Sequence, residues 1–332
     1  MKKDNFMKTV ERFMSGTQEI VSIQQDRKDG YMQMTAYYIL PGIFLTLNDV
    51  HTQSVPSNSE NMPKEALLIS YCMQGRCEFR LDEDNYSYID TNLMNIASRL
   101  VQEQFYYPSS YYMGYEIYLL PSFFTERTEE ALKLFHIDWR ELLQLYQKGV
   151  AFYTPAGILK LWNHIAEYCT RGDIGQLRLD TLQLLKYFQN NRPSESADTL
   201  YLSKVQAMLA KQAQLMLTQD LSRHLSVKSV AESLGVSETS LKRYFRSVFG
   251  ANISAYMNEA RMKYAAELLT GSKDSISDIA RACGYVNQGR FASVFRECYG
   301  MKPLDYRRNA ALSTDISIKE SGVKSSMCYE HL

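Results

Sequence analysis

The chain has 332 residues, of which 45% are hydrophobic and 22% are charged, and its 37 basic residues balance 37 acidic ones. That length predicts about two domains, and the composition excludes collagen-like, low-complexity and wholly disordered chains. No apolar run reaches the roughly 20 residues of a membrane-spanning helix, and no signal-peptide-like apolar run follows the N-terminal lysines. We therefore expect a cytoplasmic protein whose six cysteines are reduced thiols.

Residues 31–120 have the pattern of a β domain, because short apolar or alternating runs are separated by turns. The predicted strands are 67–73, 77–81, 86–89, 93–97 and 115–120. Gln74 and Gly75 predict a turn that would bring Cys72 and Cys77 together across a hairpin. We interpret these cysteines as small core residues, since no second pair or nearby histidine completes a metal site. Strands at this spacing predict a β-sandwich or barrel.

Helical patterns follow Pro121. Residues 124–147 hold two short amphipathic segments, Pro155 occupies the favoured first position of a helix, and residues 174–188 form an apolar-striped helix. The leucine-rich run 177–185 suits either a subunit interface or packing on the chain's own β domain, and the pattern favours neither. The polar residues 193–205 predict a linker, and residues 311–332 predict a disordered tail.

One short motif occurs twice in the last third of the chain, in residues 227–250 and again in 276–300, and such repetition is a strong organisational signal. The first copy has Val227, Val230, Ala231, Leu234, Gly235, Val236, Leu241, Phe245, Arg246, Phe249 and Gly250. The second copy has Ile276, Ile279, Ala280, Cys283, Gly284, Tyr285, Phe291, Phe295, Arg296, Tyr299 and Gly300 at the matching positions.

Each copy predicts two short helices joined by a glycine turn. Ser226, Ser237 and Ser275 are good N-caps, and glycine takes the left-handed conformation that ends a first helix. Two such helices form a helix-turn-helix, whose second helix enters the major groove of DNA. The residues that we predict to contact DNA face outward around the two second helices: Ser237, Thr239, Lys242, Arg243, Arg246, Asn287, Gln288, Arg290, Ser293 and Arg296.

The second copy resembles the signature of the AraC/XylS family of bacterial transcription regulators. The residues that carry this resemblance are Ile276, Ile279, Ala280, Gly284, Tyr285, Phe291, Phe295, Gly300, Pro303, Tyr306 and Arg307, with Arg261, Ala265, Leu268 and Leu269 in the helix between the copies. The chain departs from the family pattern at Lys302, usually serine or threonine, and at Gly289, usually small and polar. The resemblance covers about the last third of the chain.

The charge is divided unequally along the chain. Residues 201–312 hold sixteen lysines and arginines against nine acidic residues, a net charge of +7, whereas residues 1–200 hold nineteen against twenty-five, a net charge of −6. A basic C-terminal part indicates a nucleic-acid partner. The histidines are isolated, and no phosphate-binding glycine loop or nucleophile motif is present, so we expect no enzyme activity, no metal and no cofactor.

The sequence therefore predicts an α+β protein. The resemblance implies a cupin-like barrel or jelly roll in residues 1–120 that senses a small molecule, a helical extension in 121–192 that pairs two subunits, and a double helix-turn-helix in 206–310. Its expected partners are double-stranded DNA, RNA polymerase, an effector and a second copy of the chain. Abundant β-region tyrosines suit a pocket or an ordinary core, with Tyr71, Tyr88 and Tyr115 as candidates. Two alternatives remain: a regulator whose β domain binds a protein, and a cupin-like enzyme tethered to DNA.

Overall fold

The computed structural model describes residues 16–56, 63, 65–81, 83–98, 104–193 and 201–317, with side chains through residue 310. Contacts divide the chain into two compact units. The first comprises residues 1–207 together with Ser247–Gly250, and the second comprises Met208–Arg246 with residues 251–332. The described part is α+β, as the sequence predicts, with strands in the first unit and helices alone from residue 204 onward.

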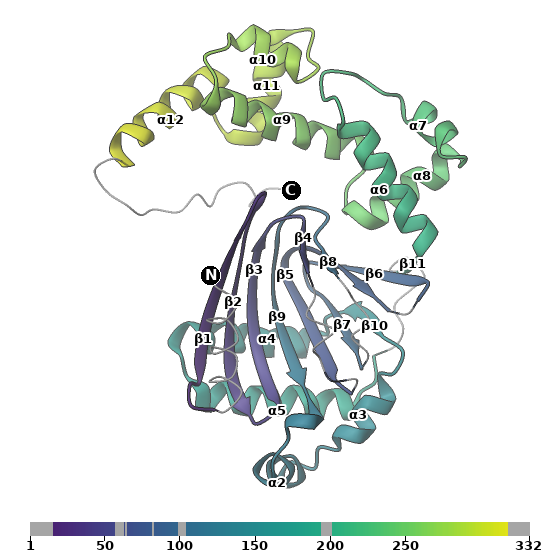
Figure 1. Cartoon of the computed structure of the whole chain (residues 1–332), viewed down its shortest axis with the longest axis vertical. Helices are drawn as coiled ribbons and strands as arrows, with labels where there is room; N and C mark the ends of the chain where they lie inside the picture. Colours follow the sequence, from purple (N-terminus) through teal and green to yellow (C-terminus); the bar gives the residue numbers. More distant parts are fainter. Residues whose placement is uncertain are drawn as a thin grey trace. The chain divides into compact units, whose positions relative to one another are not determined.

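Eleven strands form the sheet of the first unit (Figure 1). They are β1 (Ile20–Arg27), β2 (Gly30–Leu40), β3 (Ile43–His51), β4 (Ser54–Pro56), β5 (Leu67–Arg80), β6 (Asn85–Asp90), β7 (Leu93–Ala97), β8 (Gln104–Tyr106), β9 (Tyr112–Leu119), β10 (Val150–Tyr153) and β11 (Tyr201–Ser203). The order along the main path is β1-β2-β3-β9-β5-β6-β11, and β7, β8, β10 and β4 branch from it. The described strands leave this path open, so they form a sheet that does not close.

The long strand β5 joins two layers of this sheet. Its first half pairs with β9 and β7, and its second half pairs with β6. The register shifts between Cys72 and Gln74, where Gly75 has φ +80° and a side chain at Gly75 would collide with the carbonyl oxygen of Tyr111. The predicted hairpin turn at Gln74-Gly75 is therefore wrong: glycine produces a bend in one continuous strand. Cys72 and Cys77 are both buried and free on either side of that bend.

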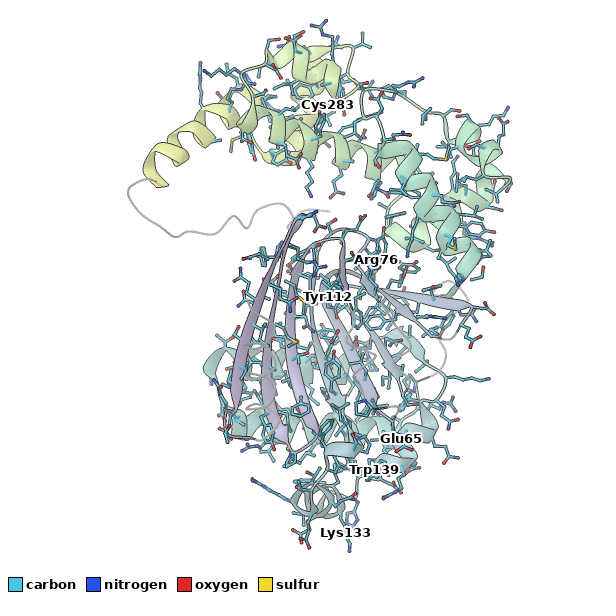
Figure 2. The ribbon with its side chains drawn as sticks, in the orientation of Figure 1. Glu65, Arg76, Tyr112, Lys133, Trp139 and Cys283 are labelled. Atoms are coloured by element: carbon cyan, nitrogen blue, oxygen red, sulfur yellow. The ribbon has the colours of Figure 1, made fainter. Side chains whose placement is uncertain are left out.

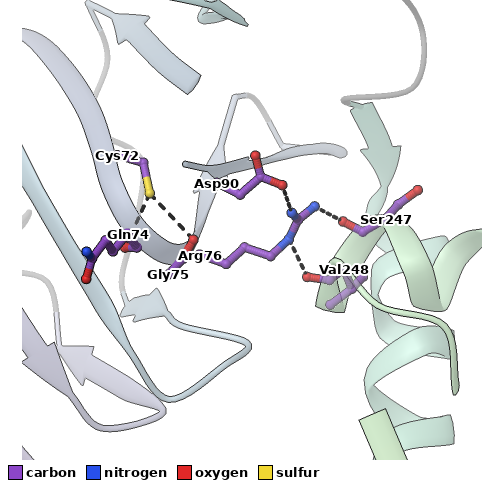
Figure 3. Close-up of polar contacts among 7 residues, drawn as sticks. All are labelled: Cys72, Gln74, Gly75, Arg76, Asp90, Ser247 and Val248. Atoms are coloured by element: carbon purple, nitrogen blue, oxygen red, sulfur yellow. Dashed lines mark hydrogen bonds and ion pairs between the residues drawn. The ribbon is translucent and has the colours of Figure 1, made fainter. Parts of the chain in front are cut away.

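Arg76 follows the bend and is 8% exposed (Figure 3). Its guanidinium forms an ion pair with Asp90 at 2.5 Å and donates to the carbonyl oxygens of Val248 and Ser247, at 2.8 and 2.5 Å. Ser247–Gly250 group with this unit. Helix-end carbonyls lack intrahelical partners, so the buried guanidinium satisfies acceptors that would otherwise be unpaired.

Helices cover one face of the sheet. They are the 3₁₀ helix η2 (Pro121–Phe123), α2 (Glu126–Leu134), α3 (Trp139–Leu145), α4 (Ala156–Arg171) and α5 (Ile174–Asn190). Trp162 of α4 stacks on Tyr71 and Tyr115 of the sheet, at ring-centroid distances of 5.1 and 6.0 Å. Within the leucine-rich run, Leu177, Leu182, Leu184 and Leu185 are buried in this core, while Leu179 is 52% exposed. Most of the run therefore packs on its own β domain.

The second unit consists of short helices around a longer one. They are α6 (Lys204–Thr218), whose first residues group with the first unit, α7 (Val227–Ser233), α8 (Glu238–Phe249), α9 (Ile253–Gly271), α10 (Ile276–Ala282), α11 (Gln288–Tyr299) and α12 (Pro303–Ser317). Helix α12 continues through residue 317, and the rest of the predicted tail lies outside the described residues. Helix α9 connects the two copies of the motif, as predicted.

Candidate functional site

The first copy of the motif folds as two capped helices around a glycine turn. The hydroxyl oxygen of Ser226 accepts a hydrogen bond from the amide of Ser229 at 3.0 Å, and that of Ser237 accepts one from Ser240 at 3.1 Å. Gly235 lies between the helices with φ +68°. The predicted caps and the predicted left-handed turn are therefore confirmed.

The second copy repeats this construction. Ser275 accepts a hydrogen bond from the amide of Asp278 at 3.1 Å, and its hydroxyl donates to the Asp278 carboxylate at 2.5 Å. Gly284 takes φ +79° at the turn. Cys283, the residue before it, is completely buried in the second unit (Figure 2). Both helix pairs thus begin and turn where the sequence places them.

Burial fixes which face of each second helix is available. Leu241 and Phe245 of α8, and Phe291 and Phe295 of α11, have no exposed surface. All ten predicted DNA-contacting residues lie on exposed positions. They are Ser237, Thr239, Lys242, Arg243 and Arg246 around α8, and Asn287, Gln288, Arg290, Ser293 and Arg296 around α11. The side chains gather on two helix surfaces of one unit.

Some of these residues also have structural roles. Ser237 caps α8, and the amide oxygen of Asn287 caps α11 by accepting a hydrogen bond from the amide of Arg290 at 3.0 Å. Lys242 pairs with Glu238 one turn earlier at 2.5 Å. The cap oxygen of Asn287 is occupied, so this side chain is less able to make the paired contact with adenine that its residue type suggests.

Sequence reasoning missed Val286, which directly precedes the cap of α11. Its side chain is fully exposed, at 102% of the reference area. The N-terminal end of a reading helix is where base contacts concentrate. Its position in the sequence, between the motif residue Tyr285 and the cap residue Asn287, could have indicated it as a contact residue.

The sequence identifies Arg261 only as a motif residue and does not predict that its buried side chain links the two helix pairs. Arg261 of α9 is 6% exposed and donates from Nε to the carbonyl of Leu221 and from Nη2 to that of Arg223, both at 3.1 Å. Nη2 also lies 3.2 Å from Nδ1 of His224, whose Nε2 lies 2.8 Å from the carbonyl oxygen of Gly284. The network links the loop before α7 to the turn of the second copy.

The candidate tyrosines of the β domain lie in packed surroundings. Tyr71 and Tyr115 face α4 and stack on Trp162. Tyr88 is 1% exposed and donates its hydroxyl hydrogen to the Glu78 carboxylate. Tyr112, which the sequence did not single out for a pocket, lies among the strands of the first unit and is completely buried (Figure 2).

A buried carboxylate also lies in the β domain. Glu116 of β9 is 5% exposed, and Tyr118 donates a hydrogen bond to it at 2.6 Å. Burial raises the pKa of Glu116 above its ordinary value of 4.5, although hydrogen bonds from Tyr118 and Asn48 act in the opposite direction. Burial also raises the pKa of the neighbouring Tyr112 and Cys77 far above neutrality. Of Glu116, Tyr112 and Cys77, Glu116 has the lowest ordinary pKa.

Replacing Glu116 by glutamine should remove a group that makes the folded protein less stable as pH rises. Because the folded-state pKa of Glu116 is raised, the folded protein binds more protons than the unfolded one just above pH 4.5, and this group lowers stability as pH rises. At pH 7 the free energy of unfolding of the variant should exceed that of the wild type by roughly 1–2 kcal/mol. This is the order of the free energy that burying an uncompensated polar group costs. Fluorescence of Trp139 and Trp162, both in the first unit, reports its unfolding in urea. A stability difference between the two proteins that is the same at pH 5 and pH 7 would contradict this.

The described residues hold neither a membrane-spanning helix nor a group of metal ligands. In the ranges that the structure describes, no helix is long and apolar enough to cross a membrane. Over the same ranges, no three histidine, cysteine, aspartate or glutamate side chains come together as a metal-ligand group.

Comparison with known proteins places the C-terminal part of the chain. A family described as a helix-turn-helix domain matches residues 230–309. The HTH-type transcriptional activator RhaR of Yersinia pseudotuberculosis is 38% identical over 92 residues, 28% of this chain and 32% of the relative. The porin thermoregulatory protein EnvY of Escherichia coli K12 is 32% identical over 91 residues, 27% of this chain and 36% of the relative. The chain thus spans about a third of the length of the curated relatives it matches.

Among solved structures, a transcriptional regulator with an AraC-type DNA-binding domain from Chromobacterium violaceum is 29% identical. The similarity covers 31% of this chain and 93% of that chain, with a TM-score of 0.30. The family match covers both second helices, α8 and α11, and the motif residues from Val230 onward. Residues 230–309 therefore match a helix-turn-helix domain, and the chain is similar there to regulators with AraC-type DNA-binding domains.

Proposed function

We propose that this protein is a sequence-specific DNA-binding transcription regulator. Its two helix-turn-helix units would enter successive major grooves on one face of double-stranded DNA, about one helical turn apart. The observation that carries the proposal is the paired construction: two capped helix pairs on one unit bury their apolar faces and leave all ten predicted contact residues exposed. The similarity to the transcriptional activator RhaR, 38% identical over 92 residues, supports the same function.

The charged residues would make two kinds of contact with DNA, to phosphates and to base edges. Lysines and arginines that face phosphates supply salt-dependent affinity without sequence preference. Arg243, Arg290 and Arg296 carry the planar fork that matches the guanine edge. The exposed methyl groups of Val286 suit the methyl group of thymine, which is read by apolar contact in the major groove.

For the rest of the chain we propose a sensor attached to this DNA-binding part. Residues 1–120 would be a cupin-like sensing domain controlled by a small molecule. Four buried polar residues on adjacent strands, Thr46, Glu116, Ser70 and Asn95, support this. Residues 121–192 would contribute to a homodimer, for which Leu179 offers an exposed apolar side chain. Residues 193–205 would link to the DNA-binding domain 206–310. Like other regulators of this type, the protein would act in the bacterial cytoplasm and contact RNA polymerase.

The Arg290→Ala variant tests base reading. If Arg290 reads a base, removing its guanidinium should weaken binding to a selected target by roughly 1–3 kcal/mol. Binding to random DNA should change much less, because a lost base contact matters only where that base is present. Fluorescence anisotropy with both DNAs, at several salt concentrations, measures the difference.

The matched control is Arg171→Ala, which removes the same charge from α4, where Arg171 pairs with Glu167. It should leave both affinities unchanged. Equal losses on selected and random DNA for Arg290→Ala would assign this residue to the phosphate backbone. A wild-type protein that never discriminates between the two DNAs would contradict the proposed function itself.

A further inference from the structure

Two neighbouring rows of residues cross the same four strands, β3, β9, β5 and β7. One row, on the face that packs on the helices, is wholly apolar: Leu45, Ile117, Ile69 and Ile96. The next row, one residue along each strand, is wholly polar: Thr46, Glu116, Ser70 and Asn95. Directly opposed residues share one face of a sheet, so the four polar side chains lie side by side on the face turned away from the helices.

This polar row is as deeply buried as the apolar one. The exposed fractions of Thr46, Glu116, Ser70 and Asn95 are 4%, 5%, 0% and 1%. Burying polar groups is unfavourable unless each finds a hydrogen-bond partner. Among the described residues, Oγ of Ser70 and Oδ1 of Asn95 have no hydrogen-bond partner. The protein therefore leaves part of the row to be satisfied by something else.

A third unpartnered group reaches the same face. Tyr112 lies on β9 four residues before Glu116, and its buried hydroxyl also has no partner among the described residues. That hydroxyl lies where a side chain at Gly114 would be, so glycine at position 114 gives it room. Residues an even number of positions apart on one strand share a face, so Tyr112 and Glu116 lie on the same face of β9. The hydroxyl therefore belongs with the polar row.

The charges around the row indicate which kind of ligand could bind there. Glu116 accepts hydrogen bonds from Tyr118 and Asn48, and its titratable neighbours Tyr107, Tyr112, Tyr118 and Cys77 are all neutral at pH 7. Across the ranges that the structure describes, the ion pairs of the β strands involve Asp49 and Asp90 and do not include Glu116. A buried carboxylate without a cation is costly, and a cation beside it offsets that cost.

The row carries one acidic group, Glu116, and its hydroxyl and amide oxygens can also accept hydrogen bonds. Apolar side chains adjoin it on the same face, with Leu68 and Cys72 on either side of Ser70. A few polar groups in an apolar lining are typical of a small-molecule site. We propose that this row, with Tyr112, binds the protonated amino group of a small organic amine. The inference rests on the proposed function in that the amine would be the regulator's effector.

The test uses the full-length protein without DNA, so it is independent of whether the chain binds DNA. Butylamine, 1,4-diaminobutane and 4-guanidinobutylamine are compared with 1-butanol, 1,4-butanediol and butyrate, by thermal unfolding and by titration calorimetry at pH 7. At least one cationic probe should raise the melting temperature with its concentration. The neutral and anionic probes should not, because neither supplies a cation for Glu116.

Variants assign the effect to the row. Glu116→Gln should weaken amine binding at least tenfold, and Ser70→Ala should weaken it severalfold. Glu126→Gln, which removes an exposed carboxylate from α2, should bind like the wild type. Should Glu116→Gln fail to fold, Ser70→Ala carries the test. No response of the wild type to any cationic probe, or an equal response of wild type and both row variants, would overturn the proposal. A crystal structure with only ordered waters on the row in the presence of the amines would overturn it too.

Discussion

Replacing Gly284 by alanine should lower the free energy of unfolding of the second unit by roughly 2–4 kcal/mol, through backbone strain and a steric clash. Gly284 has φ +79°, which residues with a Cβ rarely adopt. A Cβ there would lie 2.8 Å from the carbonyl oxygen of Leu221 and 3.2 Å from that of Ser222. These are backbone atoms of the loop that Arg261 holds, so they cannot move aside without disturbing that network.

Gly235 provides the matched control. It occupies the equivalent turn with φ +68°, but a Cβ there meets nothing within 4 Å. Gly235→Ala should therefore cost only about 1 kcal/mol, the strain of the left-handed conformation alone. Hydrogen exchange of the α7 and α10 amides, followed by mass spectrometry, measures both variants in the intact chain. Equal destabilisation by the two substitutions would show that the close approach at Gly284 has no energetic consequence.

Replacing Arg261 by methionine should destabilise the second unit by roughly 2–3 kcal/mol, because hydrogen bonds to a charged donor are lost and their acceptors are left unpaired. Methionine keeps an unbranched apolar stem but cannot donate to the carbonyls of Leu221 and Arg223 or interact with His224. DNA affinity should fall as well, since this network joins elements of both helix pairs.

Arg261→Lys distinguishes hydrogen-bond geometry from charge. Lysine retains the positive charge, but its single ammonium cannot reproduce the fork of the guanidinium. We expect a destabilisation between those of the wild type and Arg261→Met, measured by the same exchange experiment. If lysine matched arginine fully, the charge alone would account for the role of this residue.

The C-terminal third of the fold could be predicted from sequence because local signals there agree with one another. Serine caps, glycine turns and apolar stripes at helical spacing all act within a few residues, and the repeat doubles each of them. Ser226, Ser237 and Ser275 accordingly cap the expected helices. The outward positions followed from the same periodicity.

The β domain was harder because its arrangement depends on distant partners. Gly75 has the local signature of a turn, yet its strand continues, since β9 and β6 pair with the two halves of β5. The polar row could not be predicted from the sequence, because only the register of the paired strands brings Thr46, Ser70 and Asn95 beside Glu116. Likewise the sequence shows Arg261 only as a motif residue. Its hydrogen bond to the carbonyl oxygen of Leu221, 40 residues away, is known only from the structure.

Hydroxyl-radical footprinting tests the central claim most directly. The full-length protein would be bound to a fragment that it has selected from a random DNA pool. Each protomer should protect two patches on one face of the duplex, with centres about 10 base pairs apart. Arg243→Ala should weaken protection of one patch and Arg290→Ala that of the other. A single protected patch, or a pool from which no sequence is enriched, would contradict the account of two reading helices.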